Sequence, residues 1–427
     1  MSKRLFWLLI TLSFIVQLFL SFLETYGDVH AYFVPWAQSI EKYGTIGFYD
    51  RVIPPNTYAN YPPLIIYILT AFYQLGMTLI KPILDGLWTL NTTFSIFPSG
   101  IVTFFNRDNL LLFSFIKLPG ILANIALSAG VYYLVGELVP KKSSSRIAFI
   151  AFISALFNPA LIFLSALWGQ VDVLPFALVV WSFYFANKKS HNLSVLLMAL
   201  ALLSKQTAIL AVPFYAVYLS SKLTAVRIVR WSIITYITFV TMFWPFEKSV
   251  GVKFFPFISY LKIASSFASD KVSMHAHNFW QMLYPNMRDN GVRVISHIIV
   301  FSFMFFIIFR IWRKRNNLSF VLSGFGLFAV FSFMFMTRMH ERHLLAAIPF
   351  LLLAVAIDFK FYWIFLFESL YLIANMYAAW PVPYSKFLAE SLNNYWVVNV
   401  ITLVQLGVLL WATFVWIKAT RRKTTSG

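Results

Sequence analysis

Asp28 and His30 follow directly after the first long apolar run of the chain, in the stretch YGDVHA. The 427 residues include only 15 acidic ones, and four of these fall between positions 24 and 50. A carboxylate at a membrane surface can take a proton from a hydroxyl group, which makes Asp28 a candidate general base. Asp is also a favoured helix N-cap, so Asp28 could instead cap a helix that runs toward Gly44. His30 belongs either to the same site or to the membrane interface.

More polar side chains stand at the ends of later apolar runs, in the stretches KLPGILAN, WGQVDV, SKQTA and MTRMHERH. They are Lys117, Gln170, Asp172, Lys205, Gln206, Arg338, His340, Glu341, Arg342 and His343. Ionisable groups at such depth in a membrane are costly, so a functional site is the first hypothesis for them. We expect an outward-facing cavity with many cations and few acids, which suits an anionic lipid headgroup such as a polyprenyl phosphate.

Some of these residues have structural alternatives. Asp172 could cap the apolar segment that follows it. His340 and Glu341 could pair with each other as a structural lock at a buried mouth. The stretch YPPL, Tyr61 to Leu64, is expected to turn the chain toward the membrane rather than to touch substrate, because prolines fix backbone direction and supply no reacting group.

The stretch SMHAHNFW adds a further group of polar and aromatic residues. The spacing of His275 and His277 could serve a metal ion, but two histidines without a third ligand make a weak case. We expect a flexible outer loop there, with His277, Asn278 and Trp280 available for hydrogen bonding to a sugar or stacking on it.

The composition defines the class of protein that positions these residues. Hydrophobic residues make up 60% of the chain and charged residues 11%, with a mean hydropathy of +0.75. Soluble proteins carry about 25% charged residues, so we expect an all-α, polytopic membrane protein. The net charge of +19 is attributed to cytoplasmic loops rather than to nucleic-acid binding. The absence of cysteine excludes disulfides and thiolate sites.

About twelve transmembrane helices are predicted from apolar runs long enough to cross about 30 Å of hydrocarbon. The runs lie at about 5–23, 113–138, 147–168, 171–187, 192–204, 206–220, 230–245, 293–312, 318–336, 344–358, 361–378 and 396–417. The first is read as an uncleaved span, since no small-residue cleavage site follows it. With both termini in the cytoplasm, every loop on that side is basic, as the positive-inside rule requires.

The segment 61–80 is apolar enough to span the membrane, but a lone crossing would place the basic loops outside. It is therefore expected to lie in the outer interface as a helix or to form a hairpin with 86–105. The predicted organisation is a transmembrane module, 1–245, with a long outer loop, 24–108. A second outer loop, 246–292, and C-terminal helices with a cytoplasmic tail, 293–427, follow it. The site is expected on the extracytoplasmic side.

The order of the stretches YGDVHA, YPPL, KLPGILAN, WGQVDV, SKQTA, SDKVSMHAHNFW and MHERHLLAAIPF resembles the GT-C superfamily of integral-membrane glycosyltransferases. The resemblance covers roughly residues 5–350. It is closest to dolichyl- or polyprenyl-phosphate-sugar-dependent glucosyltransferases and mannosyltransferases. Where the eukaryotic glucosyltransferases have a GHFQYN-type sequence, this chain has WGQVDV, which favours the bacterial group.

The resemblance implies a hexosyltransferase in which Asp28 is the catalytic acid of the first outer loop. The implied donor is a polyprenyl-phosphate-linked sugar, and Lys117, Lys205, Arg338, His340 and Arg342 would bind its phosphate. The family's HEK corresponds to HER here, and the change from Lys to Arg alters the hydrogen-bonding geometry at position 342.

His30, Gln170, Asp172, Gln206, His277, Asn278, Trp280 and Glu341 are the candidates for binding the sugar or acceptor. The acceptor would be a glycan, a lipid-linked glycan or a protein, with membrane lipids as the other partners. A single base predicts inversion, because retention calls for a second nearby carboxylate; Glu24, Asp172 and Glu341 are the candidates for one.

No cofactor, metal or nucleotide sugar is expected, because no Asp-x-Asp pair occurs on the outer side. Two other functions stay open: a transporter or flippase of lipid-linked sugars, and an assembly subunit without catalysis. The lack of inverted repeats argues against a transporter.

Overall fold

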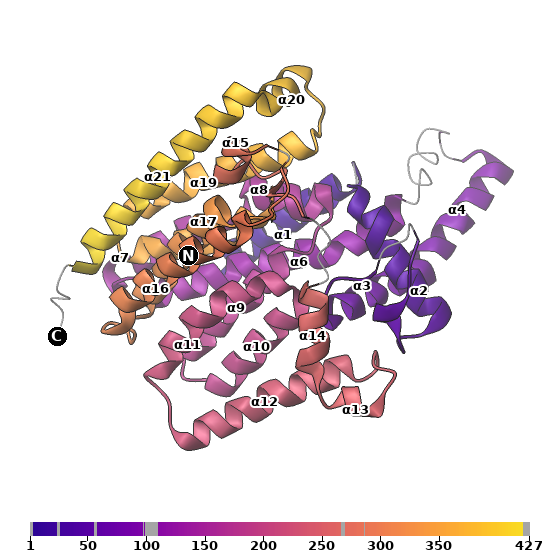
Figure 1. Cartoon of the computed structure of the whole chain (residues 1–427). Helices are drawn as coiled ribbons and strands as arrows, with labels where there is room; N and C mark the ends of the chain where they lie inside the picture. The colour runs from indigo at the N-terminus through magenta and orange to yellow at the C-terminus, as the bar shows by residue number, and fades with distance from the viewer. Residues whose placement is uncertain are drawn as a thin grey trace.

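The computed structural model describes residues 3–23, 26–54, 58–96, 98, 110–265, 270–285 and 287–421. Regular structure in these residues is almost entirely helical, which confirms the all-α prediction (Figure 1). The described exception is one parallel pair of two-residue strands, β1 (Ser273–Met274) and β2 (Met339–His340).

Nine helical segments of the described residues are long and apolar enough to cross a membrane. They comprise α1 (Lys3–Ser21), the run α3, η3 and α4 (Pro63–Leu75, Gly76–Ile80, Lys81–Phe94), α6 (Leu110–Leu138), the run α7, α8 and η5 (Lys141–Leu156, Pro159–Ile162, Phe163–Trp168), α12 (Ala225–Phe243), α16 (Val292–Trp312), α17 (Leu318–Phe335), α19 (Lys360–Ala379) and α21 (Tyr395–Arg421). The chain is therefore an integral membrane protein of many helices.

Shorter apolar helices complete the bundle: α9 (Val173–Asn187), α10 (His191–Ser204), η6 and α11 (Gln206–Ala211, Val212–Ser220), and η7, α18 and η8 (His343–Ala346, Ile348–Leu353, Ala354–Ala356). The loops carry η1 (Val29–Phe33), α2 (Val34–Tyr43), η2 (Phe48–Asp50), α13 (Val250–Lys253), α14 (Pro256–Ser265), α15 (Phe279–Leu283) and α20 (Lys386–Asn393). All twelve expected runs are helical, but four of them are shorter than a full span. The count of about twelve crossings therefore stays a prediction.

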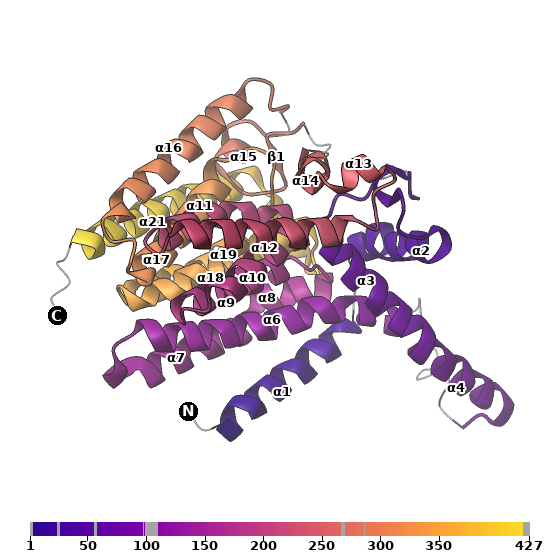
Figure 2. The same cartoon turned by 90° about the horizontal axis from the view of Figure 1, so that it is seen from below.

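The segment from Pro63 to Phe94 differs from one of its two expected forms. A hairpin would need a turn between 80 and 86, but helix continues through these positions, with a π-helical turn at Gly76–Ile80. Figure 2 shows α4 extending away from the body of the bundle. Of the second half of the expected hairpin, 86–105, positions 97 and 99–105 lie outside the described residues.

The basic connections between helices meet at one end of the bundle. Contacts between different connections include Lys188 Nζ to Glu137 Oε1 at 2.5 Å and Lys314 Nζ to the Thr420 carbonyl at 2.6 Å. Figure 2 shows the start of α1 and the end of α21 at this same end. Since α1, α10 and α17 all begin here, the residues that follow them lie at the opposite end.

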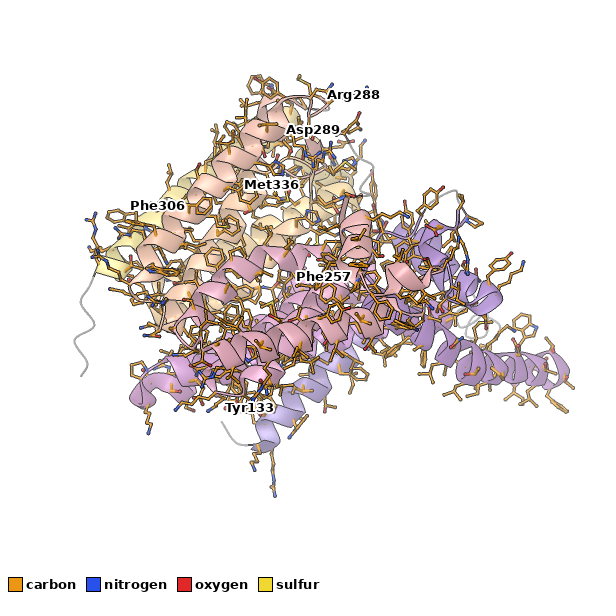
Figure 3. The ribbon with its side chains drawn as sticks, turned by 60° about the horizontal axis from the view of Figure 1, so that its bottom comes forward. Tyr133, Phe257, Arg288, Asp289, Phe306 and Met336 are labelled. Carbon is orange, nitrogen blue, oxygen red and sulfur yellow. The ribbon has the colours of Figure 1, made fainter. Side chains whose placement is uncertain are left out.

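The core and the surface divide as a membrane protein requires. Helix α17 is the most enclosed of the candidate spans, with 89% of its apolar window buried. Figure 3 shows Tyr133 of α6 and Phe306 of α16 on the outside, where both are exposed. Such side chains account for part of the 19% aromatic content as surface that faces lipid.

Candidate functional site

A cavity of about 410 Å³ lies at the end of the bundle opposite to the basic connections. Its polar lining comes from the residues that follow α1, α10 and α17, together with the loop before α3. These residues are Asp28, Tyr32, Trp36, Asn60, Tyr61, Lys205, Gln206, Thr207, Thr337, Arg338, His340, Arg342 and His343. The ends of four separate segments thus converge on one space.

Asp28 is the one carboxylate among the described residues that line the cavity. It lies at the start of the helical turn η1, but its side chain makes no capping hydrogen bond, so the capping alternative is wrong. The Gln170 amide donates a hydrogen bond to Asp28 Oδ2 instead. Arg342 Nη2 lies 3.7 Å from the same oxygen.

The environment of Asp28 shifts its proton affinity. Burial raises the pKa of the Asp28 carboxyl, and the Arg342 and Lys205 cations offset part of this effect. A carboxylate whose pKa is raised in this way is a stronger base than an exposed one while it remains ionised near neutral pH. The geometry therefore fits Asp28 as a proton acceptor.

Each of the three basic side chains that line the cavity carries a carboxylate partner. Lys205 pairs with Asp172, Arg342 Nη1 lies 2.5 Å from Glu341 Oε1, and Arg338 Nε lies 2.6 Å from Asp289 Oδ2. The three carboxylates are each 3% exposed and lie behind the cations. The described lining thus holds three cations and one acid, Asp28, as expected, but the charges of these cations are already balanced by buried carboxylates.

Two of the buried partners settle alternatives raised by the sequence. Asp172 stands at the start of α9 without a side-chain capping bond, and it contacts Lys205 and Arg342 instead. Glu341 also lies 3.7 Å from His340 Nδ1, so the expected pairing of these two residues is present. Burial together with the Arg342 charge lowers the pKa of His340, which lines the cavity.

Eight expected site residues do not line this cavity. Gln170, Asp172 and Glu341 contact side chains that do, and the other five lie apart from it. Lys117 is fully buried and donates to the Ser21 carbonyl at 2.8 Å. His30 is exposed on the η1 turn. His277 is buried, and burial lowers its pKa to about 4. The Asn278 side chain accepts from the Gln281 amide and caps α15, and Trp280 Nε1 donates to the Phe335 carbonyl at 2.7 Å. The roles expected for these five residues stay predictions.

Six of the polar residues that line the cavity escaped the sequence analysis: Tyr32, Trp36, Asn60, Tyr61, Thr207 and Thr337. The two prolines of YPPL do start α3, as expected, but Tyr61 before them turns into the cavity wall. Its hydroxyl accepts from Lys205 Nζ at 3.1 Å. The chain contains 21 tyrosines, so only the position of Tyr61 beside a proline pair could have marked it.

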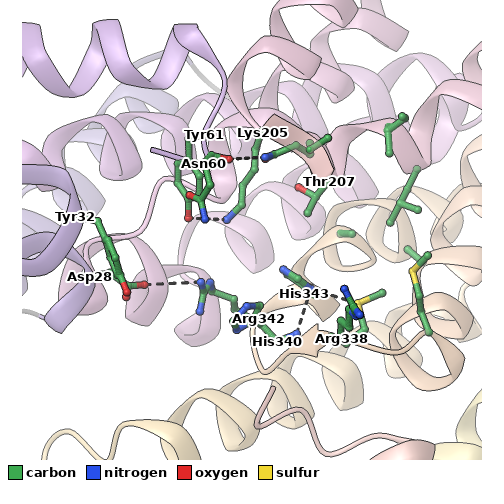
Figure 4. Close-up of a pocket in the computed structure, with 18 of the residues that line it drawn as sticks. Asp28, Tyr32, Asn60, Tyr61, Lys205, Thr207, Arg338, His340, Arg342 and His343 are labelled. Atoms are coloured by element: carbon green, nitrogen blue, oxygen red, sulfur yellow. Dashed lines mark hydrogen bonds and ion pairs between the residues drawn. The ribbon is translucent and has the colours of Figure 1, made fainter. Parts of the chain in front are cut away.

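Different kinds of side chain line the cavity from one side to the other (Figure 4). Asp28 and Tyr32 lie at one side, Arg342 and Lys205 in the middle, and Thr207 and Arg338 on the far side. Apolar lining residues are chain neighbours of this far side: Ile209, Leu210, Met336 and Met339. A ligand that reaches along the cavity would therefore meet an acid, then cations, then apolar side chains.

Residues 110–337 match the family model of glycosyltransferase family 87, which spans more than half of the chain. The chain belongs to glycosyltransferase family 87. The match includes Gln170, Asp172 and Lys205 but ends before Arg342, and Asp28 precedes it. A search of curated proteins found no match. Membership in the family confirms the prediction of a membrane-embedded glycosyltransferase, which uses a sugar donor and an acceptor.

Proposed function

We propose that this family 87 protein is an inverting transferase that moves a hexose from a polyprenyl-phosphate carrier to an acceptor hydroxyl. Mannose is favoured and glucose is possible. The observation that carries the proposal is the distance of 3.7 Å between Asp28, the sole carboxylate in the described lining, and the Arg342 cation. A base and a proposed phosphate-binding group thus lie side by side in the wall of the space where a sugar would react.

The reaction follows from this arrangement. The Asp28 carboxylate takes the proton of the acceptor hydroxyl while the hydroxyl oxygen forms a bond to the anomeric carbon. The bond from that carbon to the phosphate oxygen breaks, and its electron pair leaves with the polyprenyl phosphate. Arg342, Lys205, Arg338 and His340 are the groups proposed to stabilise that charge.

Inversion is supported by the positions of the other carboxylates. Retention calls for a second carboxylate about 5–5.5 Å from the first that can attack the sugar. Asp172 and Glu341 are buried in ion pairs and do not line the cavity. Glu24 lies outside the described residues. A single displacement with Asp28 as the base is the simpler chemistry.

The charge balance supports a carrier with one phosphate. The three cations of the lining are matched by three buried carboxylates, and Asp28 adds a fourth acid, so an incoming anion finds no surplus positive charge. A sugar phosphodiester brings one negative charge, whereas a diphosphate carrier brings two, and each added charge is more costly in a buried site. The apolar side chains beyond the cations suit the first isoprene units of a lipid.

The active site is proposed to lie on the extracytoplasmic side. Basic connections gather at the end of the bundle that carries both chain termini, and basic loops favour the cytoplasm. The cavity lies at the other end. A lipid-linked donor and its acceptor would then meet outside the cytoplasm.

The test uses the protein purified in detergent with labelled polyprenyl-phosphate-mannose or polyprenyl-phosphate-glucose, host lipid extract and EDTA. Wild type should transfer one of the two sugars and Asp28→Asn should not, although it is expressed at the same level. Asp85→Asn is the matched control, because Asp85 is exposed and pairs with Lys81 on α4, away from the cavity. Equal transfer by Asp28→Asn would remove Asp28 as the base, and movement of the donor across proteoliposomes without transfer would favour a flippase.

A further inference from the structure

Four polar side chains form a continuous hydrogen-bonded chain, of which three line the cavity and the fourth, Gln170, is buried behind its wall. Lys205 Nζ donates to the Tyr61 hydroxyl oxygen at 3.1 Å, and the Tyr61 hydroxyl donates to Gln170 Oε1 at 3.4 Å. Gln170 Nε2 then donates to Asp28 Oδ2. The chain joins the central cation of the cavity to its carboxylate through two neutral residues.

The chemistry of Lys205 fixes the direction of every bond in this chain. A protonated amine can only donate, so the Tyr61 oxygen accepts from it and the Tyr61 proton points toward Gln170. The side-chain carbonyl oxygen of Gln170 accepts a hydrogen bond from that hydroxyl, which turns the amide N–H group of Gln170 toward Asp28. An amide that donates to a carboxylate favours its ionised form, which is the form that a base needs.

The position of Tyr61 is itself held by its surroundings. Its ring lies 4.7 Å from Lys205 Nζ and packs against Trp36 with the ring centres 5.4 Å apart. The Tyr49 hydroxyl donates to the Tyr61 carbonyl at 3.0 Å, and Pro62 restricts the backbone conformation of Tyr61, which precedes it. Burial raises the pKa of Tyr61, so its hydroxyl keeps the proton that the chain requires.

We propose that Tyr61 is a positioning residue that orients the Gln170 amide so that it donates to Asp28. Asp28 Oδ2 is then occupied, and Oδ1 is left to take the proton of the acceptor. This inference rests on the proposed function for the role of Asp28 in transfer, but the hydrogen-bonded chain can be tested without any transfer.

Removal of one hydroxyl group tests the chain. In Tyr61→Phe the Gln170 amide is free to rotate, so the ionised form of Asp28 loses a fixed donor. The titration midpoint of the Asp28 carboxyl, read from infrared difference spectra against Asp28→Asn, should then move to higher pH. The charged groups that face Asp28 and contribute to that midpoint in both proteins are Arg342, Lys205, Glu341 and Asp172. Tyr58→Phe is the matched control, because Tyr58 lies in the same loop with its ring exposed.

The kinetic readout separates positioning from binding. In Tyr61→Phe, kcat should fall by about tenfold to a hundredfold, as misplaced reacting groups do, while KM for the donor changes little because Lys205 keeps Asp172. In a Gln170→Leu background, Tyr61→Phe should have no further effect, because both changes break the same chain.

An unchanged infrared midpoint in Tyr61→Phe, or additive effects of the two substitutions on it, would overturn the inference. If wild type transfers no sugar, the proposed function fails, while the infrared titration still decides the role of Tyr61.

Discussion

Asp28 and Arg342 form an ion pair in the wall of the cavity, with Arg342 Nη2 3.7 Å from Asp28 Oδ2. The two residues are more than 300 positions apart and follow different spans, α1 and α17. The Arg342 guanidinium also lies 5.8 Å from the Trp168 ring and pairs with Glu341, so it is held from several sides. A fixed cation beside a carboxylate lowers the pKa of that carboxylate, and it is placed to bind a phosphate.

The first prediction concerns the pH dependence of transfer. Burial raises the pKa of Asp28, and only its ionised form can accept a proton. As the pH falls through this raised pKa, kcat/KM should decrease, with its acidic limb above the value of about 4 for an ordinary aspartate. In Arg342→Gln the cation that lowers the pKa is lost, so the limb should move to still higher pH.

Arg342→Lys provides the control for that experiment. It keeps the positive charge near Asp28 but loses the planar group that can contact a phosphate at two points. Its acidic limb should stay closer to that of wild type, while kcat falls. An acidic limb below pH 4 in wild type, with both variants folded, would contradict the assignment of Asp28.

The second prediction concerns Gly169, which lies close to the buried side chains of Lys117 and of Val29, the residue next to Asp28. Its φ is +86°, and an added Cβ would lie 2.8 Å from Val29 Cγ2 and 3.0 Å from Lys117 Cγ. Gly169→Ala should lower stability by about 1–3 kcal/mol through overpacking. It should also reduce transfer, because Val29 is the residue next to Asp28.

Gly291→Ala separates backbone strain from the clash at Gly169. Gly291 has a similar φ of +79°, but an added Cβ would meet no atom within 4 Å. Thermal unfolding in detergent should show a smaller loss of stability for Gly291→Ala, and its transfer rate should stay near that of wild type. Equal losses for both variants would show that strain alone explains the effect at Gly169.

The sequence predicted the helices and part of the cavity for a simple physical reason. Each long apolar run must satisfy its backbone hydrogen bonds internally, so it forms a helix. Asp28, Lys205 and Arg342 each follow a helix that starts at the basic end of the bundle. Charge and run length are both visible in the sequence, so the convergence of these three residues at the opposite end of the bundle could be expected.

The ion pairs of the cavity cations and the place of Tyr61 in the cavity wall could not be predicted in the same way. Asp172 and Lys205 are 33 positions apart, and Asp289 and Arg338 are 49 positions apart. Which acid meets which cation depends on how the helices pack, and no local pattern records it. Lys117 illustrates the same limit, since it was expected in the cavity from its place at the end of an apolar run, but its side chain is buried and donates to the Ser21 carbonyl.

The third prediction concerns the pair between Arg338 and Asp289, which joins the rim of the cavity to the segment before α16. Both guanidinium contacts are short, at 2.6 and 3.0 Å, and Asp289 is buried (Figure 3 labels Asp289). Arg338→Gln leaves that carboxylate without its cation and should lower stability by about 1–3 kcal/mol.

Arg288→Gln is the matched control for this pair. Arg288 is the neighbour of Asp289 in sequence, and its pair with Asp270 is exposed. Exposed pairs contribute about 0–1 kcal/mol, so its unfolding temperature should stay close to that of wild type. Equal unfolding temperatures for the two variants would show that the Arg338 pair does not hold this segment.

The last prediction concerns Glu368, an acid inside the helix bundle. It is fully buried on α19, and both of its oxygens lie within 3.0 Å of Gln405 Nε2 on α21, while no ion pair to it occurs in the described part of the chain. An ionised carboxylate without a cation is costly in an apolar interior, so we expect Glu368 to be neutral and to act as a link between two helices.

Glu368→Gln should then leave the unfolding temperature in detergent almost unchanged, since a neutral amide can still bond to Gln405. Glu368→Leu should lower it, because the Gln405 amide loses its partner at a cost of about 1–3 kcal/mol. A large loss of stability in Glu368→Gln alone would instead show that the negative charge itself is required at this position.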